Sequence, residues 1–220
     1  MLKALKNHGL SLAMFGLFLL FLIGQSIVGY YDYNNDQHDH QQPSIRYTVY
    51  LGRSHLWARV FENWESEFLQ MGACVIFTVF LFQRGSAESK DPQKEEAVDE
   101  DPRQHQHDPQ APEPVRKGGL ALKLYSHSLA MALFLLFLVS FLGHAASGTT
   151  AYNEEQREHG GAPVSMIQFV GTSRFWFESF QNWQSEFLAV AVLVGASVYL
   201  RERGSPESKP VAEPHYETGA

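Results

Sequence analysis

The apolar residues of this chain are gathered into four runs that polar stretches separate. Residues 9–31 contain no Asp, Glu, Lys or Arg, and residues 124–153 form a second run without charge. Either run exceeds the roughly 20 residues that a membrane-spanning helix requires. Two shorter uncharged runs follow at 68–83 and 187–200. The pattern predicts an all-α membrane protein with four transmembrane helices, at about 9–31, 64–83, 122–146 and 183–201.

The chain repeats itself at a constant offset of 119 residues, so that Trp57–Arg84 returns without a gap as Trp176–Arg203. The first long apolar run also matches the second, with His8 and His127 at equivalent positions. Such self-similarity indicates two copies of one structural unit. We predict two tandem helical hairpins, at 1–90 and 120–209, a disordered acidic cytoplasmic linker at 91–119 and a disordered tail at 210–220.

An amphipathic, Trp-rich stretch precedes the second helix of each hairpin. At about 100° per residue, Trp57, Phe61, Trp64 and Phe68 fall within an arc of about 60°. The opposite, polar face holds His55, Arg59, Glu62, Asn63, Ser66 and Glu67. The uncharged parts that follow give only about 24 and 21 Å of helix, less than the roughly 30 Å of hydrocarbon. Because Trp is enriched where lipid meets water, we expect four interfacial anchors: Trp57, Trp64, Trp176 and Trp183. Whether each stretch continues into its span is left open.

The net charge of −7 comes mostly from residues 85–115, which hold nine acidic and three basic residues. This acidity argues against a nucleic-acid partner. The segment lacks aromatic residues and cannot bury enough apolar surface to fold, so we expect it to be disordered. Cys74 is the sole cysteine, which excludes an intramolecular disulfide.

The basic residues predict the orientation of the chain in a membrane. Of the 17 Lys and Arg residues, 12 lie in the two chain ends and the linker: Lys3, Lys6, Arg84, Lys90, Lys94, Arg103, Arg116, Lys117, Lys123, Arg201, Arg203 and Lys209. The positive-inside rule therefore predicts that both termini are cytoplasmic. The two hairpins then enter the membrane in the same sense, as parallel repeats.

Six polar residues form the candidate polar or ion site: Asn63, Ser66, Glu67, Asn182, Ser185 and Glu186. In a helix, the Asn and Glu of each copy share one face, and Ser closes the same arc. A carboxylate near hydrocarbon is costly and marks a functional hypothesis. In one interpretation the set caps and orients an interfacial turn. In another, Glu67 and Glu186 face each other across the repeat axis and bind a cation or proton. The third is contact with a lipid headgroup or a partner protein.

Histidines offer the other candidate chemistry. His8 and His127 begin equivalent helices and could ligate a haem iron from two sides; the alternative is a histidine at a helix start that contacts headgroups. His38–His40 could be a metal-binding fragment, but the second copy offers only Arg157–His159, and two ligands do not close a site. We therefore predict no metal and no cofactor. The chain has no nucleophile elbow, phosphate loop, dinucleotide fingerprint or zinc-protease helix, so an enzyme is not expected.

The F-x-N-W-x-S-E-F-L motif at Phe61–Leu69 and Phe180–Leu188, with R-G-S-x-E-S-K at Arg84–Lys90 and Arg203–Lys209, resembles a family of small bacterial integral membrane proteins described as domain-of-unknown-function family 6766. The resemblance covers nearly the whole chain except the acidic linker. It implies a multi-pass protein of the bacterial cytoplasmic (inner) membrane and brings no activity.

We therefore expect a non-enzymatic integral membrane protein, structural or interacting, of the bacterial cell envelope. Its expected partners are the lipid bilayer and a second copy or another membrane protein. The alternative is a small ion- or proton-coupled carrier that uses Glu67 and Glu186.

Overall fold

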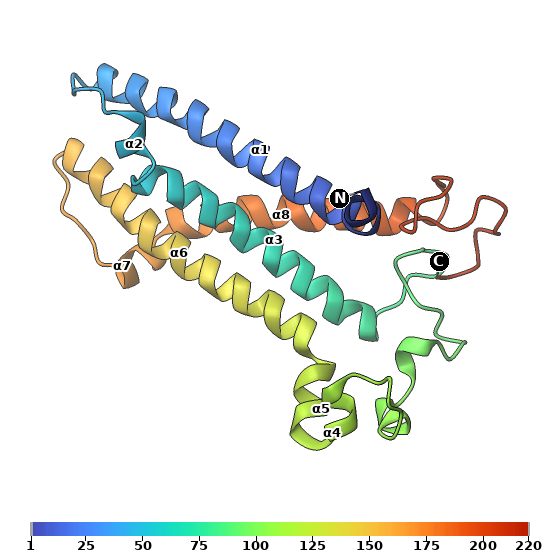
Figure 1. Cartoon of the computed structure of the whole chain (residues 1–220). Coiled ribbons are helices and arrows are strands. Elements are labelled where there is room, and N and C mark those ends of the chain that lie inside the picture. The colour runs from blue at the N-terminus through green and yellow to red at the C-terminus, as the bar shows by residue number, and fades with distance from the viewer. Residues whose placement is uncertain (1, 220) are drawn as a thin grey trace. The chain divides into compact units, whose positions relative to one another are not determined.

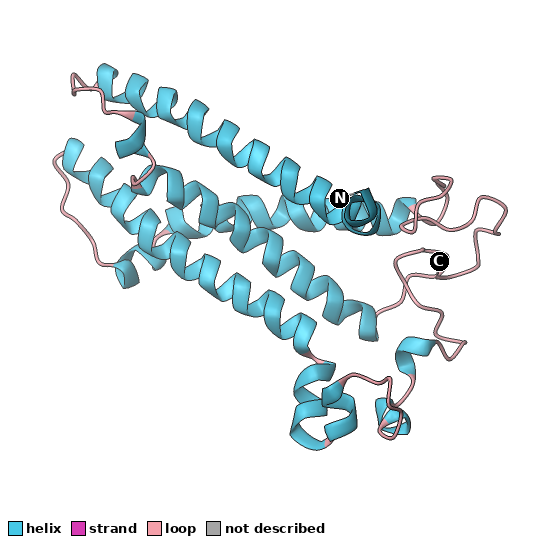
Figure 2. Cartoon of the chain, in the orientation of Figure 1, coloured by secondary structure: helices cyan, strands magenta, loops and turns pink. Residues whose placement is uncertain are grey.

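The computed structural model describes residues 2–219, which form helices and loops without a strand (Figure 2). The prediction of an all-α chain is therefore confirmed. Two helices in this range, Asn7–Asp39 and Ser128–Glu158, are long and apolar enough to cross a membrane. The helices α3 (Ser54–Phe80) and α8 (Ser173–Ala196) are not among them. Both carry charged residues through their first half, which leaves a short apolar part.

The first helix, α1 (Leu2–Asp39), is blue in Figure 1 and has one residue with non-helical backbone angles, His8, at φ −127° and ψ 18°. The equivalent residue, His127, separates α5 (Gly119–Ser126) from α6 (Ser128–Glu158), with φ −117° and ψ 8°. The predicted span at 122–146 was thus placed across a break. Around it, the hydroxyl of Ser126 donates to the Leu122 carbonyl and that of Ser128 to the Tyr125 carbonyl, which satisfies carbonyls near the interruption.

The long helices extend beyond their apolar runs and end in the same way. The amide of Gln42 donates to the Gln37 carbonyl at 2.7 Å, and Gln41 has a φ of 59°. In the second copy, the amide of Gly161 donates to the Gln156 carbonyl at 2.6 Å, and Gly160 has a φ of 72°. A left-handed residue followed by this long backbone bond is the Schellman ending of a helix. It stops α1 and α6 eight or more residues after the predicted spans.

The chain divides into two compact units, of which the first comprises residues 2–60 and 143–170. It contains α1, the short α2 (Tyr47–Tyr50), the first turns of α3, the end of α6 and the short α7 (Met166–Val170). The loop between α1 and α2 is held by Asn34, whose side chain accepts from the Ile45 amide at 2.8 Å and donates to its carbonyl at 3.3 Å. Asn153 makes the same pair of bonds to Val164, at 2.7 and 2.9 Å.

Each of these short helices buries an aromatic ring against a glycine. Tyr50 and Phe169, at equivalent positions of the two copies, are each only 1 % exposed. Tyr50 lies against Gly29 of α1, and Phe169 lies against Gly148 of α6. A Cβ at Gly29 would overlap the Tyr50 hydroxyl, and one at Gly148 would overlap the Phe169 ring, so the glycines allow the close approach.

The second unit comprises residues 61–142 and 171–219. It contains most of α3, the linker, α5, the first half of α6, α8 and the C-terminal segment. In both α3 and α8, the amphipathic stretch and the apolar stretch form one uninterrupted helix, which answers the question that the sequence left open. The hydroxyl of Thr172 accepts from the Phe175 amide at 3.3 Å and caps α8.

The linker at 91–119 contains three short helical elements: η1 (Ala97–Asp99), η2 (Pro102–His105) and α4 (Glu113–Lys117). Most of its side chains are exposed, although Lys90 pairs with Asp99 beside η1. Short helical turns of this kind are stabilised by hydrogen bonds between residues close in sequence, and they need no hydrophobic core. Disorder of this segment in solution stays a prediction.

The R-G-S-x-E-S-K motif closes a loop after each second helix. The Ser89 hydroxyl accepts from the Gln83 amide at 3.0 Å and donates to the Lys90 carbonyl at 3.2 Å. The Ser208 hydroxyl repeats both bonds, from the Glu202 amide at 2.9 Å and to the Lys209 carbonyl at 3.2 Å. The identity of the motif in both copies therefore has a structural reason in this loop.

Candidate functional site

Two buried carboxylates on α3 form the centre of the candidate site, which lies in the second unit. Glu62 and Glu65 are 7 % and 0 % exposed. The side-chain amide of Asn182 donates to Glu62 Oε1 at 2.6 Å, and the indole Nε1 of Trp183 donates to Glu65 Oε1 at 3.0 Å. Because the two glutamates are three residues apart, they share one face of α3, and consecutive residues of α8 meet them.

Local contacts hold the two donors on α8. The Asn182 amide also donates to the Glu178 carbonyl one turn earlier, at 3.2 Å. The Trp183 ring packs against Phe180 and Phe137, with centroids 5.5 and 6.4 Å away. Aromatic neighbours fix the plane of the indole and thus aim its N–H group. The carboxylates therefore meet donors whose positions the fold has already set.

The serines predicted for the ion site bond within their own helices. The Ser66 hydroxyl, almost fully buried, donates to the Asn63 carbonyl at 2.7 Å. The Ser185 hydroxyl, which is exposed, donates to the Asn182 carbonyl at 2.8 Å. These bonds replace part of the local helix bonding and direct neither hydroxyl at a carboxylate. Asn63 itself is exposed.

The two glutamates that the sequence singled out are less buried than Glu62 and Glu65. Glu67 is exposed and Glu186 is half-buried. The two carboxylates act on each other electrostatically, so the fold does bring them near one another. Of the six predicted residues, Asn182 donates to a buried carboxylate of α3, that of Glu62.

The four predicted anchors divide into two kinds. Trp57 and Trp176 are 38 % and 36 % exposed, and the Trp57 indole donates to the Leu51 carbonyl at 2.9 Å. Trp64 and Trp183 are half-buried, and the indole N–H of Trp183 donates to the Glu65 carboxylate. Anchoring at an interface stays a prediction for all four.

The proposed haem ligands His8 and His127 are both exposed, each at the helix interruption described above. The two histidines therefore occupy equivalent positions, each at the point where helical geometry is interrupted. Haem ligation by them stays the alternative that the sequence left open, beside the prediction of no cofactor.

Sequence reasoning missed Glu65 and assigned Glu62 only to a polar face. The repeat contained a signal for both. At the equivalent positions the second copy has Gln181 and Gln184, whereas the flanking Asn, Trp, Ser and Glu are unchanged. Where one copy has a charged residue and the other a neutral one, the surroundings of that position differ between the two copies.

A cavity of about 290 Å³ lies between the later turns of α3 and α8. Its wall includes Cys74 and Phe77 of α3 and Val190 of α8, and Glu88 and Ser89 line its polar end. Burial, and then the nearby Glu207, raise the pKa of the Glu88 carboxyl above its usual range. The mixed lining suits an apolar chain with a polar end.

Neither the curated proteins nor the solved structures compared with this chain gave a match. A family model described as Domain of unknown function (DUF6766) matches residues 1–220, and the chain therefore belongs to this family.

Proposed function

We propose that the protein is a non-enzymatic, four-span protein of the bacterial cytoplasmic membrane that serves as a structural or interaction partner in the cell envelope. The observation that carries this proposal is the exposure of the apolar helices. In the most apolar 18-residue stretch of each helix, only 6 % is buried in α1 and 17 % in α6. The core helix of a soluble protein would be mostly buried. Surfaces of this length and apolarity require lipid or another apolar helix against them.

In this proposal α3 and α8 supply the second and fourth spans. Their apolar parts, residues 68–80 and 187–196, are short for a bilayer. Local thinning of the bilayer, or submersion of the Trp-bearing turns, offsets such a deficit. The excess of basic residues at the chain ends and linker supports cytoplasmic termini and parallel hairpins.

The polar contacts of α3 support a structural role. Glu62 and Glu65 accept hydrogen bonds from side chains of α8, and such bonds tie one helix to another. Interhelical hydrogen bonds stabilise membrane proteins by roughly 0.6 to 2 kcal/mol each, and bonds to a charged group by about 1.5–3 kcal/mol. The second copy needs no equivalent charge for this purpose, which agrees with Gln181 and Gln184. The exposed surface of α1 is then the face offered to a second copy or to another membrane protein.

A second candidate is a small ion- or proton-coupled carrier. The observation that favours it is the complete burial of the Glu65 carboxylate, because ionisable groups inside a membrane protein mark ion and proton pathways. Glu67 and Glu186, whose charges interact, would add two further carboxylates. In this alternative the parallel hairpins move against each other around the carboxylates.

Reconstituted vesicles distinguish the two functions. The wild-type chain, a Glu62→Gln/Glu65→Gln variant and a Glu67→Gln/Glu186→Gln variant are inserted at equal density, and proton and cation flux are recorded. We expect flux equal to that of protein-free vesicles for all three, together with lower thermal stability of the first variant. Wild-type flux that either variant abolishes while remaining inserted would reject the structural function in favour of the carrier.

Topology reporters test the membrane arrangement itself. Reporters fused at both termini and within 91–119 are expected on the cytoplasmic side, and reporters at 41–44 and 160–163 on the opposite side. A linker reporter on the other side from either terminus contradicts the four-span arrangement.

A further inference from the structure

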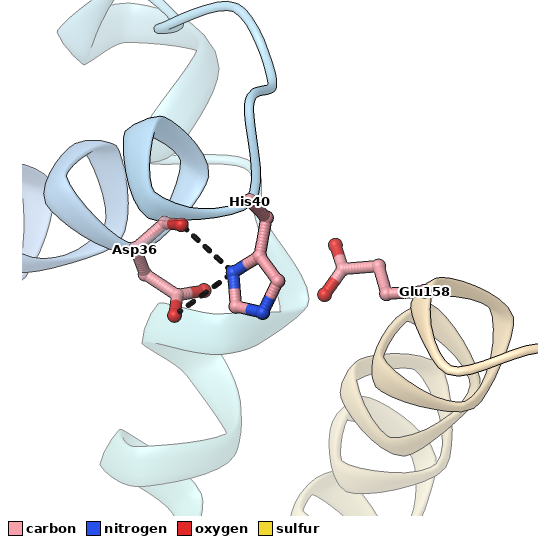
Figure 3. Close-up of side chains that lie close together, drawn as sticks. All are labelled: Asp36, His40 and Glu158. Carbon is pink, nitrogen blue, oxygen red and sulfur yellow. Dashed lines mark hydrogen bonds and ion pairs between the residues drawn. The ribbon is translucent and has the colours of Figure 1, made fainter.

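The polar ends of α1 and α6, both in the first unit, bring metal-binding side chains together. Asp36 and His40 come from the end of α1, and Glu158 is the last residue of α6. One possible ligand atom of each residue lies within 4.8 Å of the other two. Figure 3 shows the imidazole of His40 between the Asp36 side chain and the Glu158 carboxylate. A mixture of imidazole and carboxylate is the ligand set that proteins use for Zn²⁺ and related divalent ions.

The orientation of His40 suits a metal ligand. Its Nδ1 lies 2.9 Å from the Asp36 carbonyl oxygen and 3.5 Å from the Asp36 carboxylate. Because a carbonyl oxygen only accepts, Nδ1 carries the hydrogen and Nε2 keeps a free electron pair. Metal-binding histidines are usually fixed in this way, by a carbonyl or carboxylate on the ring nitrogen that does not bind the metal. The Asp36 carbonyl therefore orients His40 and leaves Nε2 as the ring nitrogen that can bind a metal.

A second histidine has the same arrangement nearby. His159 Nδ1 lies 2.9 Å from the Glu155 carbonyl oxygen, so its Nε2 is also left as an acceptor. The ring centroids of His40 and His159 are 6.2 Å apart. Asp36 with His40, and Glu155 with His159, are equivalent carboxylate-x-x-x-His pairs of the two copies. The sequence comparison of His38–His40 with Arg157–His159 treated each segment by itself. It therefore did not predict that His40 and His159, at the ends of two different helices, lie close together.

The charge of the two helix ends favours a cation. Residues 36–40 and 154–159 hold five acidic residues and one basic residue, Arg157. Divalent ions bind sites where negative ligands outnumber positive neighbours. The three candidate ligands Asp36, His40 and Glu158 are exposed, so an ion could enter from solvent without a change of fold.

We propose that Nε2 of His40 and the carboxylates of Asp36 and Glu158 bind one divalent transition-metal ion of the zinc class, with His159 beside the site. Three protein ligands leave a fourth position for water. The bound ion links the end of α1 to the end of α6. This site goes beyond the proposed function and does not depend on the membrane arrangement.

Metal titration of the full chain in detergent tests the site. After treatment with a chelator, Zn²⁺ binding is measured by calorimetry, and Co²⁺ binding by its visible absorption, which reports nitrogen and oxygen ligands. We expect one ion per chain. His40→Ala and Asp36→Asn each remove a ligand and are each expected to weaken binding at least about tenfold.

Matched variants separate this site from accidental binding. His38→Ala changes a histidine two residues from His40, and a His105→Ala/His107→Ala variant removes the histidines of the linker; both are expected to leave the affinity within about twofold. Helix content by circular dichroism confirms that each variant is folded, and Glu158→Gln tests the ligand set without touching a histidine. No binding by the wild-type chain, or binding that only the linker variant abolishes, would overturn the proposal.

Discussion

The Glu65 carboxylate, which is fully buried, accepts a hydrogen bond from the indole Nε1 of Trp183 at 3.0 Å. This bond joins α3 to α8 and uses a charged acceptor, and such bonds contribute about 1.5–3 kcal/mol. The ring of Trp183 has aromatic neighbours on its own helix, so its N–H group reaches the carboxylate with little loss of freedom. Removing this pair therefore tests directly how much the contact between the two helices contributes to the stability of the protein.

Trp183→Phe is expected to lower the free energy of unfolding by about 1.5–3 kcal/mol, because it removes the donor and keeps most of the ring. A double-mutant cycle with Glu65→Gln, followed by denaturant unfolding in detergent, isolates the contribution of the pair. Trp176→Phe is the control on the same helix, at a more exposed ring. A coupling energy within about 0.5 kcal/mol of zero means that the contact does not stabilise the protein.

The class of the fold and its two most apolar helices could be predicted from the sequence, because their signal is local. Runs such as 9–31 contain no charge, and no other context is needed to recognise them. The repeat likewise predicted that His8 and His127 are equivalent, and the interruptions of α1 and α6 occur at these residues. The interruptions themselves were not predicted, since no Pro lies at either position and Gly9, which follows His8, is replaced by Ser128 after His127.

The identity of the buried carboxylates could not be predicted, because it depends on which face of α3 meets α8. By helical position, Glu62 and Glu67 were both assigned to the polar face, yet Glu62 is buried and Glu67 is exposed. The tertiary contact of Glu62 to Asn182 distinguishes the two. The cluster of Asp36, His40 and Glu158 has the same origin, since Glu158 is more than a hundred residues from the other two along the chain.

Gly29→Ala is expected to destabilise the first unit by about 1–3 kcal/mol, because the new methyl group overlaps the buried Tyr50 hydroxyl. Gly24→Ala, one turn earlier with nothing within 4 Å, is the matched control and is expected to gain up to about 1 kcal/mol from helix propensity. Both are measured by thermal unfolding in detergent. The next atoms of the Tyr50 ring are 3.4 and 3.8 Å from the added carbon, so adding Tyr50→Phe to Gly29→Ala should restore stability. Failure of this rescue would show that the hydroxyl is not the cause.

The stability of the first unit is expected to fall as the pH falls below the pKa of a histidine in the unfolded chain. Burial, and then the charge of Arg59, lower the pKa of His55 below the ordinary 6.5. The ring lies beside Tyr33 and 3.3 Å from the Tyr50 hydroxyl. Between the lowered pKa and 6.5 the unfolded chain binds more protons than the folded chain, so stability rises with pH across this window and is lost below it.

The His55→Gln variant isolates this contribution, because every other titrating group is common to both proteins. Between about pH 7.5 and pH 5, the melting temperature of the wild-type chain should fall more than that of the variant. His38→Gln, at an exposed histidine, should follow the wild-type curve. Parallel curves for His55→Gln and the wild-type chain would contradict the expected role of His55.

Gln41→Gly is expected to stabilise the end of α1. Gln41 has a φ of 59°, in the left-handed region, whereas the second copy has Gly160 at the equivalent position with a φ of 72°. A side chain costs about 1 kcal/mol or more in this region, and glycine avoids most of this cost. The reverse change, Gly160→Gln, should therefore lower stability by a similar amount. Unfolding curves of the two variants and of the wild-type chain, recorded under one condition, should place the wild type between them. A decrease in stability for Gln41→Gly would mean that the Gln41 side chain contributes more than the strain costs.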